Sequence, residues 1–240
     1  MKYVLSLLAG VLCGAVIVIL ALYYNPLVQE NTRVPLAAAP GASVEVFYGT
    51  AGDTVARTGP ADGLLAPVPA SAETLWESAL AWTEARLLLL RDVDGRALGF
   101  GVRFAALASA TRPLTGELLA NSVWNLHLPG RGSLWVDGVD NLWPLARHVL
   151  VPAWRAEDGA WQGSFDGDIT VGPRPSRVAV MTGGAGVFAG TRGEAREALS
   201  VEALSLRDGR LAAEGSLLVA ITGAAGHGGH GGQGGPVSPE

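Results

Sequence analysis

No charged residue occurs between Val4 and Tyr24, and most of this stretch is apolar. A helix over it, rising 1.5 Å per residue, is long enough to cross the roughly 30 Å apolar core of a bilayer. The pattern predicts a transmembrane signal anchor, with residues 4–24 in the lipid bilayer. Cleavage as a signal peptide is the alternative, although the run exceeds the about 7–15 apolar residues typical of such peptides.

Beyond residue 42 the pattern changes to short apolar runs and period-two alternation, separated by Gly, Pro and Asp. Strands are predicted over Val44 to Tyr48, Ala85 to Leu90 and Ala97 to Leu107. The turn Asp92-Val93-Asp94-Gly95 joins the last two strands into a hairpin. On the second strand of this hairpin, glycines share one face with Arg103, and glycines on a strand face permit the curvature that barrel closure needs.

A glycine-rich string, Gly-Ala-Gly-Val-Phe-Ala-Gly-Thr-Arg-Gly, covers residues 184–193 and follows an apolar run over residues 178–181. Its first six residues match G-x-G-x-x-G/A, the dinucleotide-binding fingerprint. That fold requires an uninterrupted helix next, but Gly190 and Gly193 fall in its first turns and each costs about 1 kcal/mol there. The chain that remains is also too short for further βα units. A turn between two strands is the favoured interpretation.

The whole string matches G-x-G-x-F-x-G-x-x-G, with Gly184, Gly186, Phe188, Gly190 and Gly193 at its fixed positions. In this form it resembles the turn between late strands of allene oxide cyclase-like and dirigent-like β-barrels. The flanking strands and the Asp208-Gly209 turn extend the resemblance to about residues 161–221. It implies an eight-stranded antiparallel barrel, often trimeric, with an apolar cavity. Residues 194–202 favour helix by propensity, so strand or helix stays open there.

We therefore predict a mainly β protein, an antiparallel, eight-stranded closed barrel preceded by one N-terminal transmembrane helix. The predicted divisions are a signal anchor over 1–24, a Pro/Ala-rich linker over 25–42, the barrel domain over 43–222 and a Gly/His-rich disordered tail over 223–240. Within the barrel domain, Ser71 as an N-cap predicts a short helix from Ala72 to about Ala81.

Composition supports this fold class. Hydrophobic residues make up 49% of the chain and charged residues only 16%, with 33 glycines and 14 prolines, which suits a turn-rich β domain. The net charge of −5 and the lack of Lys/Arg clusters argue against nucleic acid as a partner.

Lys2 before the span predicts that the N-terminus lies in the cytoplasm and the domain outside it, which is the periplasm if the source is bacterial. Because Cys13 lies in the span, the domain itself has no cysteine, which is compatible with an oxidising compartment.

Candidate chemistry lies on the strand pair predicted over residues 121–137. Period-two alternation gives one face the polar or amphipathic residues Asn125, His127, Trp135 and Asp137, if the register allows. Turned inward, they would line a ligand cavity, with His127 and Asp137 as an acid–base pair and Arg103 as an anion partner. The alternative is the solvated face of an ordinary antiparallel pair.

Two functions stay open. The first is a membrane-tethered barrel that binds a lipophilic small molecule or an envelope partner without catalysis. The second, which the resemblance implies, is a cyclase/isomerase-like or dirigent-like enzyme acting on an apolar substrate in the barrel cavity. The resemblance also implies a homotrimer, and it transfers no catalytic residue to this chain. The sequence predicts no cofactor and no metal site.

Overall fold

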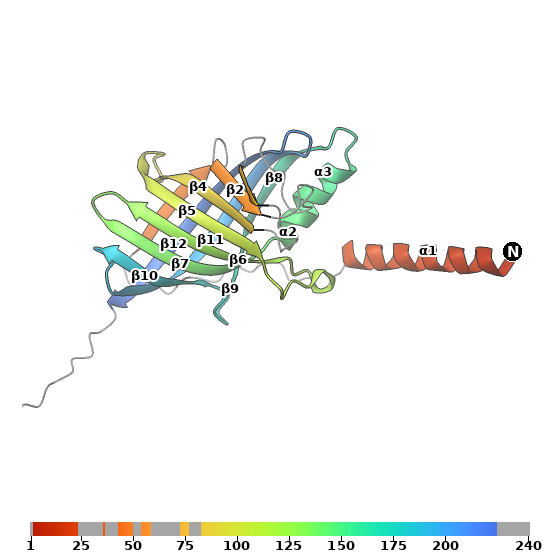
Figure 1. The fold of residues 1–240 in the computed structure, drawn as a ribbon, viewed down its shortest axis with the longest axis horizontal. Coiled ribbons are helices and arrows are strands. Elements are labelled where there is room, and N and C mark those ends of the chain that lie inside the picture. Colours follow the sequence, from red (N-terminus) through yellow and green to blue (C-terminus); the bar gives the residue numbers. More distant parts are fainter. Residues whose placement is uncertain are drawn as a thin grey trace, which may run out of the picture.

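A computed structural model of the chain describes residues 2–23, 36, 43–49, 54–58, 73–76 and 83–224. Figure 1 shows helix α1 (Lys2–Tyr23) projecting away from a β-barrel. In the part of the chain that the structure describes, no helix is both long enough and apolar enough to cross a membrane. The transmembrane anchor predicted over residues 4–24 is therefore not confirmed. Apart from Leu36 and residues 223–224, the predicted linker and tail lie outside the described residues.

Eight antiparallel strands form the closed barrel that the sequence predicts. Their order around the wall is β1-β12-β11-β10-β7-β6-β5-β4, and a pair between Phe47 of β1 and Arg91 of β4 closes the ring. These strands are β1 (Ser43–Gly49), β4 (Thr83–Arg91), β5 (Ala97–Leu107), β6 (Leu119–Leu128), β7 (Gly132–Asn141), β10 (Ala179–Gly186), β11 (Thr191–Ser205) and β12 (Arg210–Ala224).

Four further strands extend the wall. Strand β2 (Thr54–Thr58) pairs antiparallel with β4, and β3 (Glu73–Trp76) pairs parallel with β2. Strand β8 (Ala160–Asp168) pairs with β11, and β9 (Thr170–Gly172) pairs with β7. The helix predicted from Ala72 is wrong over β3, where Thr and Trp favour a strand and β2 supplies a partner. The rest of that predicted helix lies outside the described residues.

A helical segment, residues 143–155, covers one end of the barrel and was not predicted. It consists of α2 (Trp143–Leu145), the π-helix η2 (Ala146–Leu150) and α3 (Val151–Arg155), and a separate 3-10 turn, η1 (Pro113–Thr115), precedes β6. Leu145, Val149 and Ala153 recur every four residues, so they share one face. That face packs on a second core of Phe165, Val201, Leu204 and Ala213, from β8, β11 and β12 (Figure 1).

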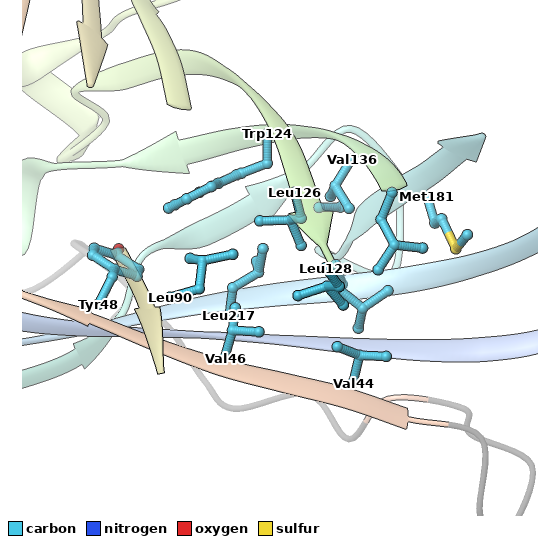
Figure 2. Close-up of a cluster of buried hydrophobic side chains, with 14 of the residues drawn as sticks. Val44, Val46, Tyr48, Leu90, Trp124, Leu126, Leu128, Val136, Met181 and Leu217 are labelled. Atoms are coloured by element: carbon cyan, nitrogen blue, oxygen red, sulfur yellow. The ribbon is translucent and has the colours of Figure 1, made fainter. Parts of the chain in front are cut away.

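Side chains fill the other part of the barrel interior. Alternate residues of neighbouring strands point inward and are buried, as period-two geometry requires. An eight-stranded barrel is just wide enough for such side chains to fill it. Figure 2 shows this main core, with Tyr48 and Met181 far apart within it. The core includes Val44, Val46, Leu88, Leu90, Leu126, Leu128, Leu134, Val136, Met181 and Leu217.

The glycine-rich string forms the turn between β10 and β11, and it places Phe188 in the main core. Phe188 is only 2% exposed, and the Arg131 guanidinium lies 5.2 Å from its ring centroid. Gly186 has φ 67°, and a Cβ on Gly184 would lie 2.6 Å from the Phe188 carbonyl oxygen. Only glycine suits both positions. A strand follows the turn over residues 191–205, so the dinucleotide-binding alternative and a helix over 194–202 are both wrong.

We predict that Phe188→Ala lowers the free energy of unfolding by about 3–5 kcal/mol, because it leaves a cavity in the main core. The neighbouring side chain of Val187 is 64% exposed, so Val187→Ala is the matched control and is expected to change stability by no more than about 0.5 kcal/mol. Urea unfolding of both variants measures the difference. Equal losses in the two variants would show that Phe188 does not hold this end of the barrel.

Candidate functional site

Ionisable and aromatic side chains meet inside the barrel, beyond the apolar core. This polar cluster is defined by five residues from five strands, Tyr48 (β1), Arg103 (β5), Trp124 (β6), Asp140 (β7) and Glu197 (β11). Each lies at an inward position of its strand. Because buried charges are costly unless they are paired, the contacts within the cluster decide whether it is stable.

Arg103 lies between two carboxylates. Its Nη2 donates to Asp140 Oδ2 at 2.7 Å, and its Nε lies 3.2 Å from Glu197 Oε1 and 3.3 Å from Glu197 Oε2. Charge-assisted hydrogen bonds of this kind are stronger than neutral ones. The guanidinium therefore joins β7 to β11 across the interior of the barrel.

Glu197 accepts hydrogen bonds from two aromatic side chains as well. The Tyr48 hydroxyl donates to Oε1, and the Trp124 indole Nε1 donates to Oε2 at 3.0 Å. The Tyr48 and Trp124 rings lie 5.1 Å apart, and Arg103 lies 5.9 Å from the Trp124 ring centroid. Gly215 of β12 pairs with Tyr48, and a Cβ there would lie 2.0 Å from the Tyr48 ring. Because Gly215 has no side chain, the tyrosine ring can occupy the space beside it.

Thr170 connects the cluster to the β8–β9 segment. Its hydroxyl lies 3.5 Å from Asp140 Oδ1 and accepts a hydrogen bond from the Glu197 backbone N–H at 2.9 Å. The Ile169 N–H donates to the Glu197 carbonyl at 3.0 Å. The β8–β9 segment is therefore held to the backbone of the same glutamate whose side chain binds Arg103.

Burial changes the proton affinity of the cluster. It raises the pKa of Asp140 from 3.8 to about 6, with a smaller contribution from Glu197 and against the opposing effect of Arg103. Burial, followed by the charge of Glu197, raises the pKa of Tyr48 well above 10. Burial acts to lower the pKa of Arg103, but Glu197 and Asp140 outweigh it and raise that pKa, so Arg103 stays charged.

The cluster becomes more exposed toward β4. The side chain of Asp140 is 1% exposed, that of Arg103 is 11% exposed, and that of Arg86 is 18% exposed. Arg86 pairs with Glu84 on the inner face of β4, and Arg86 lies opposite Arg103 in the β4–β5 register. The exposed fraction thus rises from Asp140 through Arg103 to Arg86.

The structure places only one of the five predicted cavity residues inside the barrel, Arg103. Asn125 and His127 lie on the outer face of β6, because the alternate residues Trp124 and Leu126 occupy the interior. Trp135 and Asp137 lie on the outer face of β7 in the same way. His127 pairs with Ser133 in the register, and its Nδ1 lies 3.1 Å from the Ser133 hydroxyl. His127 and Asp137 are therefore not brought together in the interior.

The outer wall around these residues is unusually apolar. Leu89, Phe100 and His127 follow one another across β4, β5 and β6, and the Phe100 and His127 rings lie 5.0 Å apart. The large exposed apolar residues of this wall are Leu87, Leu89, Phe100, Phe104, Val123 and Trp135. Exposed patches of this kind mark interaction surfaces. The homotrimer that the resemblance implies stays a prediction, and this wall is where it is best tested.

Sequence reasoning missed Tyr48, Trp124, Asp140 and Glu197. Tyr48 and Trp124 read as ordinary aromatic core positions, and Asp140 belongs to the string Asp-Gly-Val-Asp, which looks like a turn. The signal that the sequence does contain is the alternation of side chains between the two faces of a strand. Trp124 shares a face with Leu126 and Leu128, and Asp140 shares a face with Leu134 and Val136. In the part of the chain that the structure describes, no group of three or more His, Cys, Asp or Glu side chains is arranged to hold a metal ion.

Comparison with known proteins finds similarity only among solved structures. No family model matches the chain, and no curated protein matches it. A nonspecific heme-binding cyclase of neoabyssomicin biosynthesis is 10% identical, with a TM-score of 0.35, over 77% of this chain and 70% of that chain. The pterocarpan synthase dirigent protein is 14% identical, with a TM-score of 0.34, over 80% of this chain and 97% of that chain.

We predict that Asp140→Asn changes how stability depends on pH. Since the pKa of Asp140 is raised on folding, the folded chain binds more protons between pH 3.8 and about 6, and this residue's contribution to stability falls as the pH rises through that range. Asparagine cannot ionise. The free energy of unfolding of the variant, relative to that of the wild type, should therefore rise by up to about 3 kcal/mol between about pH 4 and pH 7. Urea unfolding at a series of pH values measures this, and parallel stability curves would contradict it.

Proposed function

We propose that the protein binds a small organic molecule with an apolar body and one hydroxyl or carbonyl group at the polar cluster. The observation that supports this most is the cluster itself, five paired polar side chains buried inside a barrel. Replacing such buried ion pairs by apolar residues is often neutral or stabilising, so packing alone does not require them. Groups with perturbed pKa values concentrate at functional sites.

Arg103 is the group that we expect to meet the ligand. Within the described part of the chain its hydrogen bonds use Nε and Nη2, so Nη1 is the remaining nitrogen that can donate to a ligand oxygen. Arg103 also lies on the more exposed side of the cluster, toward Arg86. The Trp124 ring lies beside it, with Leu126 and Leu90 packed nearby, so the surroundings of Arg103 are apolar on this side.

Catalysis of a proton transfer is the second candidate, as in a cyclase or isomerase. The pKa of Asp140, about 6, favours it, because a general acid or base works best when its pKa lies near the working pH. In this case Asp140 would exchange a proton with the bound molecule while Arg103 held its oxygen. Deuterium incorporation into the bound molecule, lost in Asp140→Asn, would separate catalysis from binding alone. Membrane attachment and a location outside the cytoplasm stay predictions.

The test is native mass spectrometry of the full chain, purified gently from its source. We expect the wild type to carry a small organic molecule, and Arg103→Gln to lose it, because the ligand oxygen no longer meets a charged donor. Arg174→Gln is the matched control, since Arg174 pairs with Glu194 on the outside of the barrel. It should retain the added mass.

Thermal unfolding shows whether each variant is folded. If Arg103→Gln does not fold, Tyr48→Phe takes its place, because it keeps the ring and removes only the hydroxyl that donates to Glu197. A wild-type chain without added mass, or equal retention in the cluster variant and the control, would overturn the proposed site.

A further inference from the structure

A small pocket lies on the outer wall of the barrel, where the start of β6, the end of β7 and strand β9 meet. Its volume is about 300 Å³, at the lower end of the range of small-molecule sites. Leu119, Val139 and Val171 give it an apolar lining, and Glu117 and Arg177 add one charge of each sign. None of the five residues of the polar cluster lines this pocket.

The lining residues of β6 and β7 share the outward face of the wall. Leu119 alternates with the buried Ala120 on β6, and Val139 alternates with the buried Asp140 on β7. Glu117 lies two residues before Leu119, with the buried Leu118 between them, so the alternation extends to the glutamate. The carboxylate and the apolar lining are therefore presented on the same side of the sheet.

A buried side chain holds the backbone on both sides of Glu117. Asn141 is only 4% exposed, its Nδ2 donates to the Gly116 carbonyl at 3.1 Å, and its Oδ1 accepts from the Leu118 N–H at 3.0 Å. The Thr115 hydroxyl donates to Glu117 Oε2 at 3.2 Å. Among the described residues no basic side chain pairs with Glu117, and its Oε1 accepts no hydrogen bond. Glu117 therefore has one oriented oxygen and one that can accept from a ligand.

Arg177 has an unusual backbone conformation. Its φ is 60°, and in the described part of the chain it is the only residue other than glycine with a positive φ. This left-handed region is uncommon for a long side chain. The Arg177 N–H donates to the Arg174 carbonyl at 2.8 Å, and the Arg174 side chain forms an ion pair with Glu194 at 2.8 Å, which ties the turn to the wall. No acidic side chain that the structure describes pairs with Arg177, so its guanidinium keeps its donors for a ligand.

We propose that this pocket binds a small zwitterion, an α-amino acid with an apolar side chain. Glu117 and Arg177 line one pocket without pairing with each other, so a ligand that carries both an ammonium and a carboxylate group can satisfy both. The ammonium group donates to Glu117 Oε1, the carboxylate accepts from Arg177, and the side chain packs against Leu119 and Val139. This site is separate from the polar cluster and does not depend on the function proposed for that cluster.

L-leucine, 4-methylpentanoate and 3-methylbutylammonium are the probes. The second lacks only the ammonium group of leucine, and the third lacks only its carboxylate. Nuclear magnetic resonance titration of the full chain measures the affinity of each probe and the residues whose signals it shifts. We expect leucine to bind with shifts at Leu119 and Val139, and each of the other two probes to bind at least about tenfold more weakly, because each loses its hydrogen bonds to one charged group.

Two variants assign the two charges. Glu117→Gln keeps an oxygen that can accept from Thr115 and should weaken leucine binding about tenfold, with no loss for 4-methylpentanoate. Arg177→Gly removes the guanidinium, and glycine adopts φ 60° readily, so the turn is kept. It should weaken leucine binding by a similar factor, with no loss for 3-methylbutylammonium.

Glu202→Gln and Arg192→Gln are the matched controls, because both residues are exposed on β11 and neither lines the pocket. Their affinity for leucine should equal that of the wild type, and thermal unfolding shows that each variant is folded. The proposal is overturned if leucine does not bind, if its signals shift outside the pocket, if the three probes bind equally, or if the controls lose as much affinity as the pocket variants.

Discussion

The pairing of Arg103 with Asp140 and Glu197 is the constraint on which the interior of the barrel depends. Removing one partner from such a buried group leaves an uncompensated charge and costs about 3–5 kcal/mol. The three residues come from β5, β7 and β11, so the ion pairs hold together strands that are not all neighbours in the barrel wall. Tyr48 and Trp124 complete the arrangement, because their donors satisfy the carboxylate that Arg103 reaches.

The interior therefore has two parts with different chemistry. Apolar side chains fill one part, and Phe188 from the glycine-rich turn packs against them. This part of the interior stabilises the fold. The other part carries the buried charges and rises in exposure toward Arg86. In an eight-stranded barrel the interior holds either side chains or one small ligand.

The sequence predicts the strands better than the faces of the strands. Hairpins and Asp-Gly turns are local signals, so β4, β5 and the order β10, β11, β12 follow directly from them. Which face of a strand points into the barrel depends instead on the tertiary structure. On β6 the outward residue Val123 is as apolar as the inward Leu126, and Trp135 is exposed on β7, so the usual contrast between the two faces is weak. This is why the sequence leaves open whether Asn125 and His127 line the interior or lie on the solvated face, where the structure places them, and why Asp140 and Glu197 were missed.

Strand β11 connects the polar cluster to the outer surface of the barrel. Alternation sends Glu197 into the barrel and its neighbour Arg196 to the outside, where Arg196 pairs with Asp168. Asp168 is in turn two residues from Thr170, whose hydroxyl accepts from the Glu197 N–H and lies against Asp140. The short segment from Asp168 to Thr170 is thus held both by an ion pair on the outside of the barrel and by the polar cluster inside it. The Ile169 N–H also donates to the Glu197 carbonyl, so the backbone on both sides of the polar cluster's glutamate depends on this segment for its hydrogen bonds.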